Sequence, residues 1–168
     1  PNSAYPHARP TDRVIRPGEL VLLDFGGVLE GYCVDLTRMA GAGRVSAEAF
    51  SLYRAVREAL DAGVAAVHPG QLASDVDKAA RDVLEGHQLG SAFVHGTGHG
   101  LGLDVHEAPR VGPVNPAEAV RLESGMVVTI EPGAYVAGLG GVRLEDDVLV
   151  TAVGREVLTT APLDLLLV

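Results

Sequence analysis

Residues 19–39 read ELVLLDFGGVLEGYCVDLTRM, and this stretch decides the fold. It holds two runs rich in branched and aromatic residues, 19–28 and 31–39, with a short turn between them. Such a pair of runs predicts an antiparallel β-hairpin. One acid lies in each run, Asp24 in the first and Asp35 in the second, so we expect the two acids on neighbouring strands.

Two amphipathic helices are predicted to follow the hairpin. Apolar residues recur at helical spacing after Ser46, a suitable N-cap, until the breaker at residues 68–70. Residues 71–86 repeat the pattern, and Gly86 is a typical stop signal.

The rest of the chain is dominated by strand-like runs. After a glycine-rich segment at 96–102, we expect strands at 126–131, 134–137, 141–150 and 155–159. A hairpin, two helices and then several strands predict an α+β fold, in which the helices cover one face of an antiparallel sheet.

The bulk composition indicates one globular domain. The 168 residues are 47% hydrophobic, with a mean hydropathy of +0.22, which suffices for a single buried core. Apolar runs fall far short of the roughly 20 residues that span a bilayer, and no signal-peptide pattern opens the chain, so we expect no membrane partner and a cytoplasmic protein. The formal charge of −9 disfavours nucleic acid as a partner, because phosphate binding needs clustered Lys and Arg. Cys33 is the single cysteine, which excludes an internal disulfide and fits a reducing compartment.

Five side chains that could bind metal lie in short apolar or glycine-rich stretches: Asp24, Asp35, His99, Glu131 and Glu145. A lone carboxylate in such surroundings needs a positive partner, because burying it uncompensated costs several kcal/mol. The sequence offers at most one nearby arginine, Arg38 for Asp35 and Arg143 for Glu145. Four acids and one imidazole suit two divalent ions such as Mn²⁺, Co²⁺ or Fe²⁺ better than a structural zinc, and four ionised acids balance two such ions.

The segment 95–107, HGTGHGLGLDVHE, holds three histidines between alternating glycines. The glycines disfavour a helical zinc site with ligands at i and i+4, so we expect extended or looped backbone. They do not form GxGxxG, which disfavours a dinucleotide site. The sequence also lacks GxSxG, and Cys33 lacks a neighbouring base, which disfavours a nucleophilic hydrolase.

Four stretches together resemble the pita-bread metallopeptidases (peptidase family M24), the superfamily of creatinase and methionine aminopeptidase: DFGGVLEGYCVDLTR (24–38), HGTGHGLGLDVHEAP (95–109), TIEPGAYV (129–136) and GGVRLEDD (140–147). The HEAP and EPGAYV forms are more similar to Xaa-Pro peptidases, that is, prolidase and aminopeptidase P. The resemblance implies the pita-bread fold, a curved antiparallel sheet covered by helices, with residues 1–168 as a catalytic domain.

The resemblance also implies a ligand set for two metal ions. Asp24 is similar to the bidentate ligand of one ion, whereas Asp35 and Glu145 are similar to the acids that bridge both ions. His99 and Glu131 are implied to complete the set. Mn²⁺ is the first expectation for the ions, and Co²⁺, Fe²⁺ and Zn²⁺ are alternatives.

Further roles follow from the same resemblance. Glu131 is implied to be the general base, His106 to hydrogen-bond the developing oxyanion, and His95 to contact the substrate near the scissile bond. His7 is implied to line the substrate cleft with these histidines. Two residues are expected to support the bridging acids from the same strand faces: Thr37 and Arg143.

The implied function is a dinuclear exopeptidase that cleaves peptides with proline in the second position, either a dipeptidase or an aminopeptidase. The resemblance implies a homodimer. Related catalytic domains carry further helices before the equivalent of Pro1, so we expect an N-terminally truncated chain or a separate polypeptide that supplies this part. Two alternatives keep the fold: a metal-free, non-catalytic binding module and a creatinase-like hydrolase.

Overall fold

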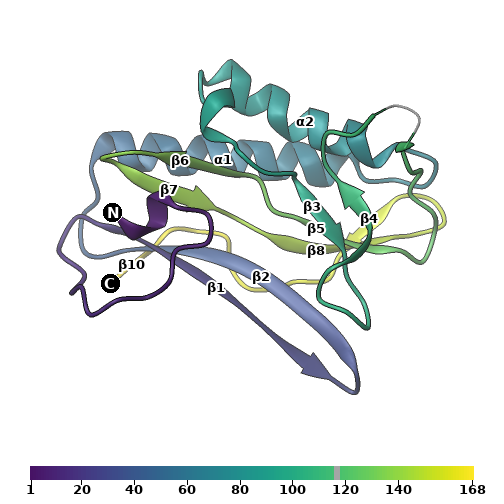
Figure 1. Ribbon diagram of the computed structural model, residues 1–168, viewed down its shortest axis with the longest axis horizontal. Helices are drawn as coiled ribbons and strands as arrows, with labels where there is room; N and C mark the ends of the chain where they lie inside the picture. The colour runs from purple at the N-terminus through teal and green to yellow at the C-terminus, as the bar shows by residue number, and fades with distance from the viewer. Residues whose placement is uncertain (116–117) are drawn as a thin grey trace.

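The computed structural model describes residues 1–115 and 118–168 (Figure 1). Two α-helices, two short 3₁₀ helices and a set of strands follow one another in this order: η1 (Asn2–Ala4), β1 (Leu20–Leu29), β2 (Tyr32–Gly41), α1 (Ala47–Ala66), α2 (Ala73–Gly86), η2 (Gly90–Ala92), β3 (Gly98–Gly100), β4 (Glu107–Val111), β5 (Val127–Ile130), β6 (Gly133–Val136), β7 (Gly140–Arg143), β8 (Asp146–Val150), β9 (Arg155–Val157) and β10 (Leu166–Leu167).

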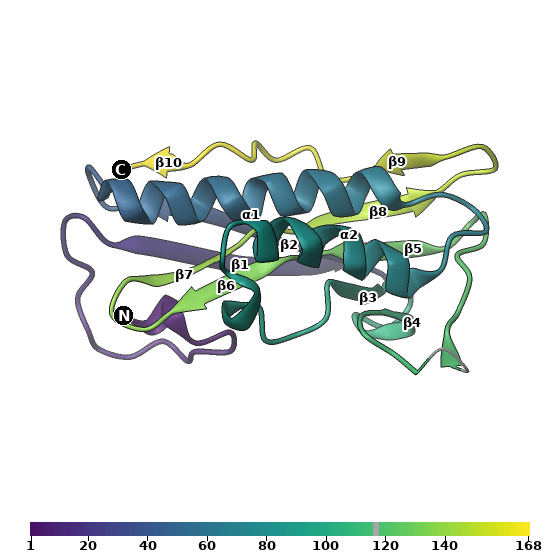
Figure 2. The ribbon, with the colours of Figure 1, turned by 90° about the horizontal axis from the view of Figure 1, so that it is seen from above.

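The helices α1 and α2 pack against each other and lie over one face of the strands (Figures 1 and 2). The Ser46 hydroxyl caps α1 as predicted, because it accepts a hydrogen bond from the Ala49 amide at 3.1 Å. The helix α2 ends at Gly86, the predicted stop. Buried apolar side chains of both helices meet the inner strands to form the core: Val56, Leu60, Val76, Ala80, Val128, Ile130, Val142 and Leu144. Neither helix is long and apolar enough to cross a membrane.

Within residues 1–115 and 118–168, the strands form three hydrogen-bonded sheets rather than one continuous sheet. Their orders are β1-β2-β10, β4-β3-β5-β8-β9 and β6-β7. Strand pairs are antiparallel except that β10 runs parallel to β2. The short strands β4 and β10 were not among the expected ones. Strand β4 pairs with the nearby strand β3, whereas β10 pairs with β2, which is distant in sequence.

The run at 141–150, expected as one strand, is divided into β7 and β8. Strand β7 pairs with β6, whereas β8 pairs with β5. Between them the Leu144 amide donates to the Pro132 carbonyl at 3.4 Å, and the Glu145 amide donates to the Thr37 carbonyl at 3.2 Å. The backbone therefore changes partners at this point, which places the Glu145 side chain at a junction of sheets.

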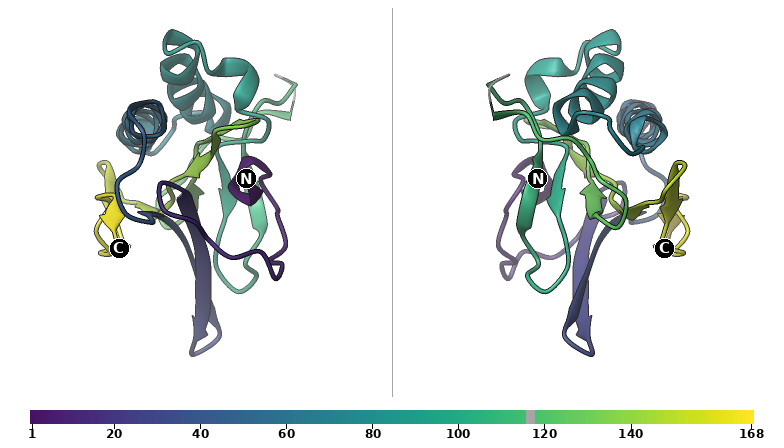
Figure 3. Two further views of the ribbon diagram at one scale, coloured as in Figure 1. Left: turned by 90° about the vertical axis from the view of Figure 1, so that its left-hand side faces the viewer. Right: turned by 90° about the vertical axis from the view of Figure 1, so that its right-hand side faces the viewer.

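The hairpin β1–β2 follows the predicted pairing over its whole length, with Asp24 opposite Thr37 and Asp35 opposite Gly26. Its turn residues Glu30 and Gly31 both have positive φ, 51° and 92°, which matches the twist of a two-residue hairpin turn. The distal half of the hairpin projects away from the helices (Figure 3). Large apolar side chains on this part are exposed: Leu23, Phe25, Val28, Leu29 and Tyr32.

Candidate metal centre

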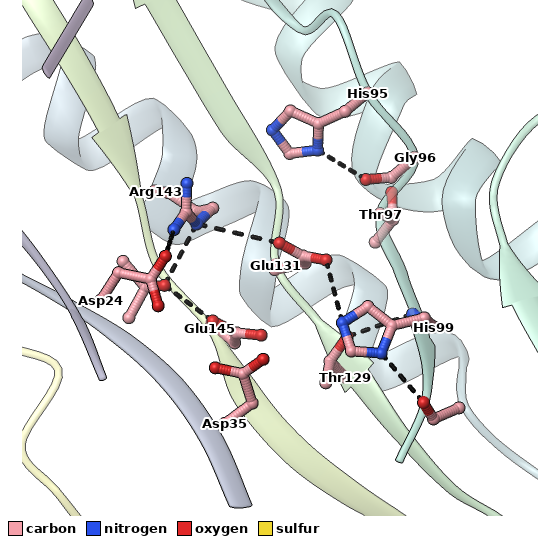
Figure 4. A network of polar contacts seen from close by, with 12 residues as sticks. Asp24, Asp35, His95, Gly96, Thr97, His99, Thr129, Glu131, Arg143 and Glu145 are labelled. Atoms are coloured by element: carbon pink, nitrogen blue, oxygen red, sulfur yellow. Dashed lines mark hydrogen bonds and ion pairs between the residues drawn. The ribbon is translucent and has the colours of Figure 1, made fainter. Parts of the chain in front are cut away.

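Most of the predicted ligands converge at the junction of β2, β3, β5 and β8 (Figure 4). One ligand atom from each of His99, Glu131 and Glu145 lies within 4.8 Å of the other two. The same holds for Asp35, His99 and His106, so His99 belongs to both groups. Asp35 and His106, which are 71 positions apart in the chain, therefore have ligand atoms within 4.8 Å of each other.

The close approach of β3 to β5 places His99 beside Glu131. A Cβ atom at Gly98 would meet the Thr129 carbonyl oxygen at 1.9 Å, so only glycine allows this contact. The His99 amide donates to the Thr129 hydroxyl at 3.1 Å. The alternating glycines of the histidine-rich segment thus serve backbone packing, and the segment is extended over β3 as expected.

The environment of the His99 ring favours a neutral metal ligand. Its Nδ1 lies 2.9 Å from the Gly100 carbonyl, which can only accept, so the proton is assigned to Nδ1. This leaves Nε2 without a proton, 3.6 Å from a Glu131 carboxylate oxygen. Burial lowers the pKa of His99, so the ring is uncharged at neutral pH. The ring of His106, itself exposed, lies 4.2 Å away between centroids.

The charged forms of the buried Glu145 and the half-buried Glu131 are both disfavoured by their surroundings. Burial, opposed by the charge of Arg143 and assisted by the charges of Asp35 and Asp24, raises the pKa of Glu131 to about 7. Burial, followed by repulsion from Glu131 and Asp35, raises the pKa of Glu145 to about 9. Acids that resist ionisation in this way are stabilised as anions by a cation, so the donor set fits the divalent ions that the sequence predicts.

Asp24 differs from the other predicted ligands. It belongs to neither group of converging ligand atoms, and its side chain is 52% exposed. The expectation that Asp24 is buried in its apolar surroundings is therefore wrong, because β1 leaves the core after its first residues. Its carboxylate binds the guanidinium of Arg143, a partner that lies 119 positions away in sequence.

Arg143 joins the hairpin to the buried acids. It is only 4% exposed, and its Nε donates to the Thr37 hydroxyl at 3.1 Å. Thr37 in turn donates to a Glu145 carboxylate oxygen at 2.7 Å. Arg143 therefore reaches Glu145 through Thr37 and reaches Asp24 directly.

Two of the predicted cleft histidines, His95 and His7, lie near Arg143, whose Nη1 donates to the Tyr135 hydroxyl at 3.4 Å and to the Pro6 carbonyl at 3.1 Å. His95 Nδ1 donates to the Gly96 carbonyl at 2.7 Å, and its Nε2 accepts from the Tyr135 hydroxyl at 2.9 Å. Burial lowers the pKa of His95. His7 is exposed and lines a pocket of about 610 Å³ together with Asp24. Tyr135 was missed as a site residue, although it lies in the EPGAYV motif, four positions after Glu131.

Asp147 is a second missed residue, adjacent to the centre. One of its carboxylate oxygens accepts the Asp35 amide at 3.2 Å. The other is buried without a hydrogen-bond partner among the described residues, and burial raises the pKa of the group to about 6. Its position on β8, next to β2 of another sheet, became apparent only from the tertiary contacts between these two strands.

A family model for metallopeptidase family M24 matches residues 1–152. The chain belongs to metallopeptidase family M24. This M24 chain is 41% identical to an uncharacterized peptidase of Bacillus subtilis (strain 168), YqhT, over 165 residues, or 98% of the chain and 46% of that relative.

Two solved structures show the same architecture as the M24 chain. The Xaa-Pro dipeptidase from Bacillus anthracis has a TM-score of 0.93 and 41% identity, and the match covers 99% of this chain and 46% of that one. The X-Pro aminopeptidase from Thermotoga maritima MSB8 has a TM-score of 0.93 and 35% identity, with the same coverage. The expected pita-bread fold is thus confirmed, and the M24 chain spans somewhat less than half the length of these relatives.

Proposed function

We propose that this protein is a dinuclear metal-dependent exopeptidase that hydrolyses Xaa-Pro bonds. The observation that carries the proposal is the convergence of Asp35, His99, Glu131 and Glu145 at one sheet junction in an M24 chain. Names of similar structures, an Xaa-Pro dipeptidase and an X-Pro aminopeptidase, support the substrate class.

We assign the two ions to five ligands: Asp24, Asp35, His99, Glu131 and Glu145. When bound, two divalent ions would lower the pKa of the attacking water and polarise the scissile carbonyl. Asp24 must provide its ligand oxygen while Arg143 holds the carboxylate, and its exposed side chain leaves room for this. Mn²⁺ is the ion that we propose first, before Co²⁺, Fe²⁺ and Zn²⁺.

The chain's own residues move the protons. Glu131 accepts a proton from the attacking water and passes it to the leaving nitrogen, because it is more exposed than Glu145, the other glutamate of the centre. His106 lies beside His99 with an exposed ring and donates a hydrogen bond to the developing oxyanion. His95 contacts the substrate near the scissile bond, with its ring oriented by Gly96 and Tyr135, and His7 lines the cleft.

Hydrolysis of defined peptides by the full-length protein tests the function. We expect Mn²⁺-loaded protein to cleave Xaa-Pro dipeptides, longer Xaa-Pro peptides, or both, and to leave the same peptides with alanine in place of proline largely intact. Cleavage of dipeptides only identifies a dipeptidase, whereas cleavage of longer peptides identifies an aminopeptidase. Failure to cleave either set, with the metal content verified by elemental analysis, contradicts the proposal.

Further expectations from the sequence stay predictions. These are the cytoplasmic location, the homodimer, and residues 1–168 as one catalytic domain completed by a preceding part of the protein or by a separate polypeptide. Size-exclusion chromatography with light scattering tests the homodimer.

A further inference from the structure

Asp77 is a buried acid that lies outside the candidate metal centre, on α2. It is 2% exposed, and both of its carboxylate oxygens bind Arg81, one helical turn later. The Arg81 Nε lies 3.0 Å from Oδ2, and the Arg81 Nη2 lies 2.9 Å from Oδ1. The helical spacing of apolar residues predicts the helix but not the role of this pair, because Asp77 and Arg81 resemble the charged residues of any other helix.

The remaining hydrogen-bonding groups of this pair bind the segment that leads into β3. The Oδ1 atom of Asp77 accepts the Thr97 amide at 3.0 Å and the Thr97 hydroxyl at 2.8 Å. Arg81 donates to the Phe93 carbonyl at 3.1 Å and to the His95 carbonyl at 2.9 Å. Its guanidinium also lies over the Phe93 ring, 4.1 Å from the centroid. Two side chains of α2 thus hold residues 93, 95 and 97.

This segment carries residues of the candidate site on both sides of Thr97. His95 and His99 lie two positions before and after it, and Figure 4 shows the three residues in succession beside Glu131. Thr97 is fully buried, and its carbonyl accepts the Glu131 amide at 2.6 Å. A shift of Thr97 therefore displaces two histidines and the backbone of the proposed general base together.

We propose that Asp77 and Arg81 are positioning residues for the proposed reaction, which set the places of His95, His99 and Glu131 through Thr97. The inference rests on the proposed function. Its physical basis is that Asp77 and Arg81 direct their hydrogen bonds at residues 93, 95 and 97 of one segment. We call this pair of side chains on α2 the template, because it holds that segment in place. Misplacement of reacting groups by about 1 Å can lower turnover on the order of 100-fold, which makes such a template consequential.

The variants Asp77→Asn and Arg81→Lys test the template. Asparagine keeps the shape of the side chain but removes the charge that pairs with Arg81, and lysine cannot reach two carbonyls and the carboxylate together. Thr97→Val removes only the hydroxyl bond, and Thr97→Ser keeps both bonds to Asp77. The matched control is Lys78→Met, because Lys78 and Asp82 form an exposed pair on the same helix at the same spacing.

The full-length, metal-loaded protein is assayed at a temperature at which circular dichroism shows every variant to be folded. We expect kcat to fall about 10- to 100-fold in Asp77→Asn and Arg81→Lys, with KM changed far less. Thr97→Val should lose less turnover, Thr97→Ser should restore it, and Lys78→Met should match wild type. Wild-type kcat in folded Asp77→Asn, even with a lowered melting temperature, means a structural role only and overturns the proposal.

A second measurement does not depend on activity. The chain has six histidines, so their ring signals can be assigned by heteronuclear NMR of the metal-free protein. We expect the ring signals of His95 and His99 to shift in Asp77→Asn and to stay in place in Lys78→Met. If wild-type protein hydrolyses nothing, the proposed function fails, yet unshifted ring signals would separately refute the template. If Asp77→Asn does not fold, Arg81→Lys and Thr97→Val decide the question by the same readouts.

Discussion

The two halves of the candidate metal centre place acids in opposite environments. Glu145 lies at the inner sheet junction and is 2% exposed, whereas the Asp24 side chain on the projecting hairpin is 52% exposed. Glu145 has a strongly raised pKa because burial and neighbouring acids oppose its charge. Asp24 instead binds Arg143. The comparison shows that burial and neighbouring acids oppose the charge of the inner acid, whereas the hairpin acid is solvated and has a positive partner.

The largest expected effect comes from the inner half. Glu131→Gln should reduce turnover of Xaa-Pro peptides by about 10²- to 10⁴-fold, because it removes both a proton acceptor and a ligand charge. Stopped assays at saturating substrate and elemental analysis measure turnover and metal content. Glu156→Gln on the exposed strand β9 is the matched control. Near-normal turnover in Glu131→Gln would contradict the role of Glu131.

Replacement of Arg143 breaks the connection between the two halves. We expect Arg143→Met to lose turnover by about 10- to 100-fold, because Asp24 and Thr37 both lose a hydrogen-bond donor and drift from the ligand position. Leaving these groups without a partner should also lower the free energy of unfolding by roughly 1–3 kcal/mol. Chemical denaturation measures the second effect. If Thr37→Val lowers turnover and the free energy of unfolding as much as Arg143→Met does, the contact between Arg143 and Asp24 contributes nothing to either.

Metal-free protein should become less stable as pH rises. Glutamate has an ordinary pKa of 4.5 in the unfolded chain, whereas the folded values are about 7 for Glu131 and about 9 for Glu145. Between these values the folded state binds more protons than the unfolded state, so the free energy of unfolding falls as pH rises from about 5 to about 9. Melting curves at several pH values measure this slope.

The control for this prediction is Glu145→Gln, which should flatten the slope because the amide does not titrate. Saturating Mn²⁺ should reverse the trend, since ligands must lose their protons to bind metal. A metal-free melting temperature that rises steadily from pH 5 to pH 9 would contradict the assignment of these two acids.

The smallest expected effect on stability belongs to the hairpin acid. Asp24→Asn should change the free energy of unfolding of metal-free protein by less than about 1 kcal/mol, because the Asp24 side chain is 52% exposed and the amide oxygen of asparagine can still accept from Arg143. The same variant should lower the bound metal below that of wild type, measured by elemental analysis after dialysis. Asp35→Asn, on the partner strand and more enclosed, is the comparison variant. Unchanged metal content in Asp24→Asn would remove Asp24 from the ligand set.

Local sequence patterns sufficed to predict the elements whose contacts join residues close in sequence. The hairpin was predicted from adjacent β-rich runs, and α1 from Ser46 and the helical spacing after it, because these signals act between residues close in sequence. The division of 141–150 was not predictable, since it depends on which distant strands accept the Leu144 and Glu145 amides. The same reason explains why β10, which pairs with the distant strand β2, was not expected.

The sequence by itself determined the α+β order of elements, the family resemblance and the types of residue that suit a metal centre, because composition, spacing and motifs are local properties. Only the tertiary structure decided which side chains contact one another. It assigned Arg143 to Asp24 and Thr37, placed Tyr135 against His95, and left the distal hairpin exposed. These contacts join positions about 40 to 119 residues apart. Burial and charge pairing arise when folding brings such positions together, so no window of sequence contains them.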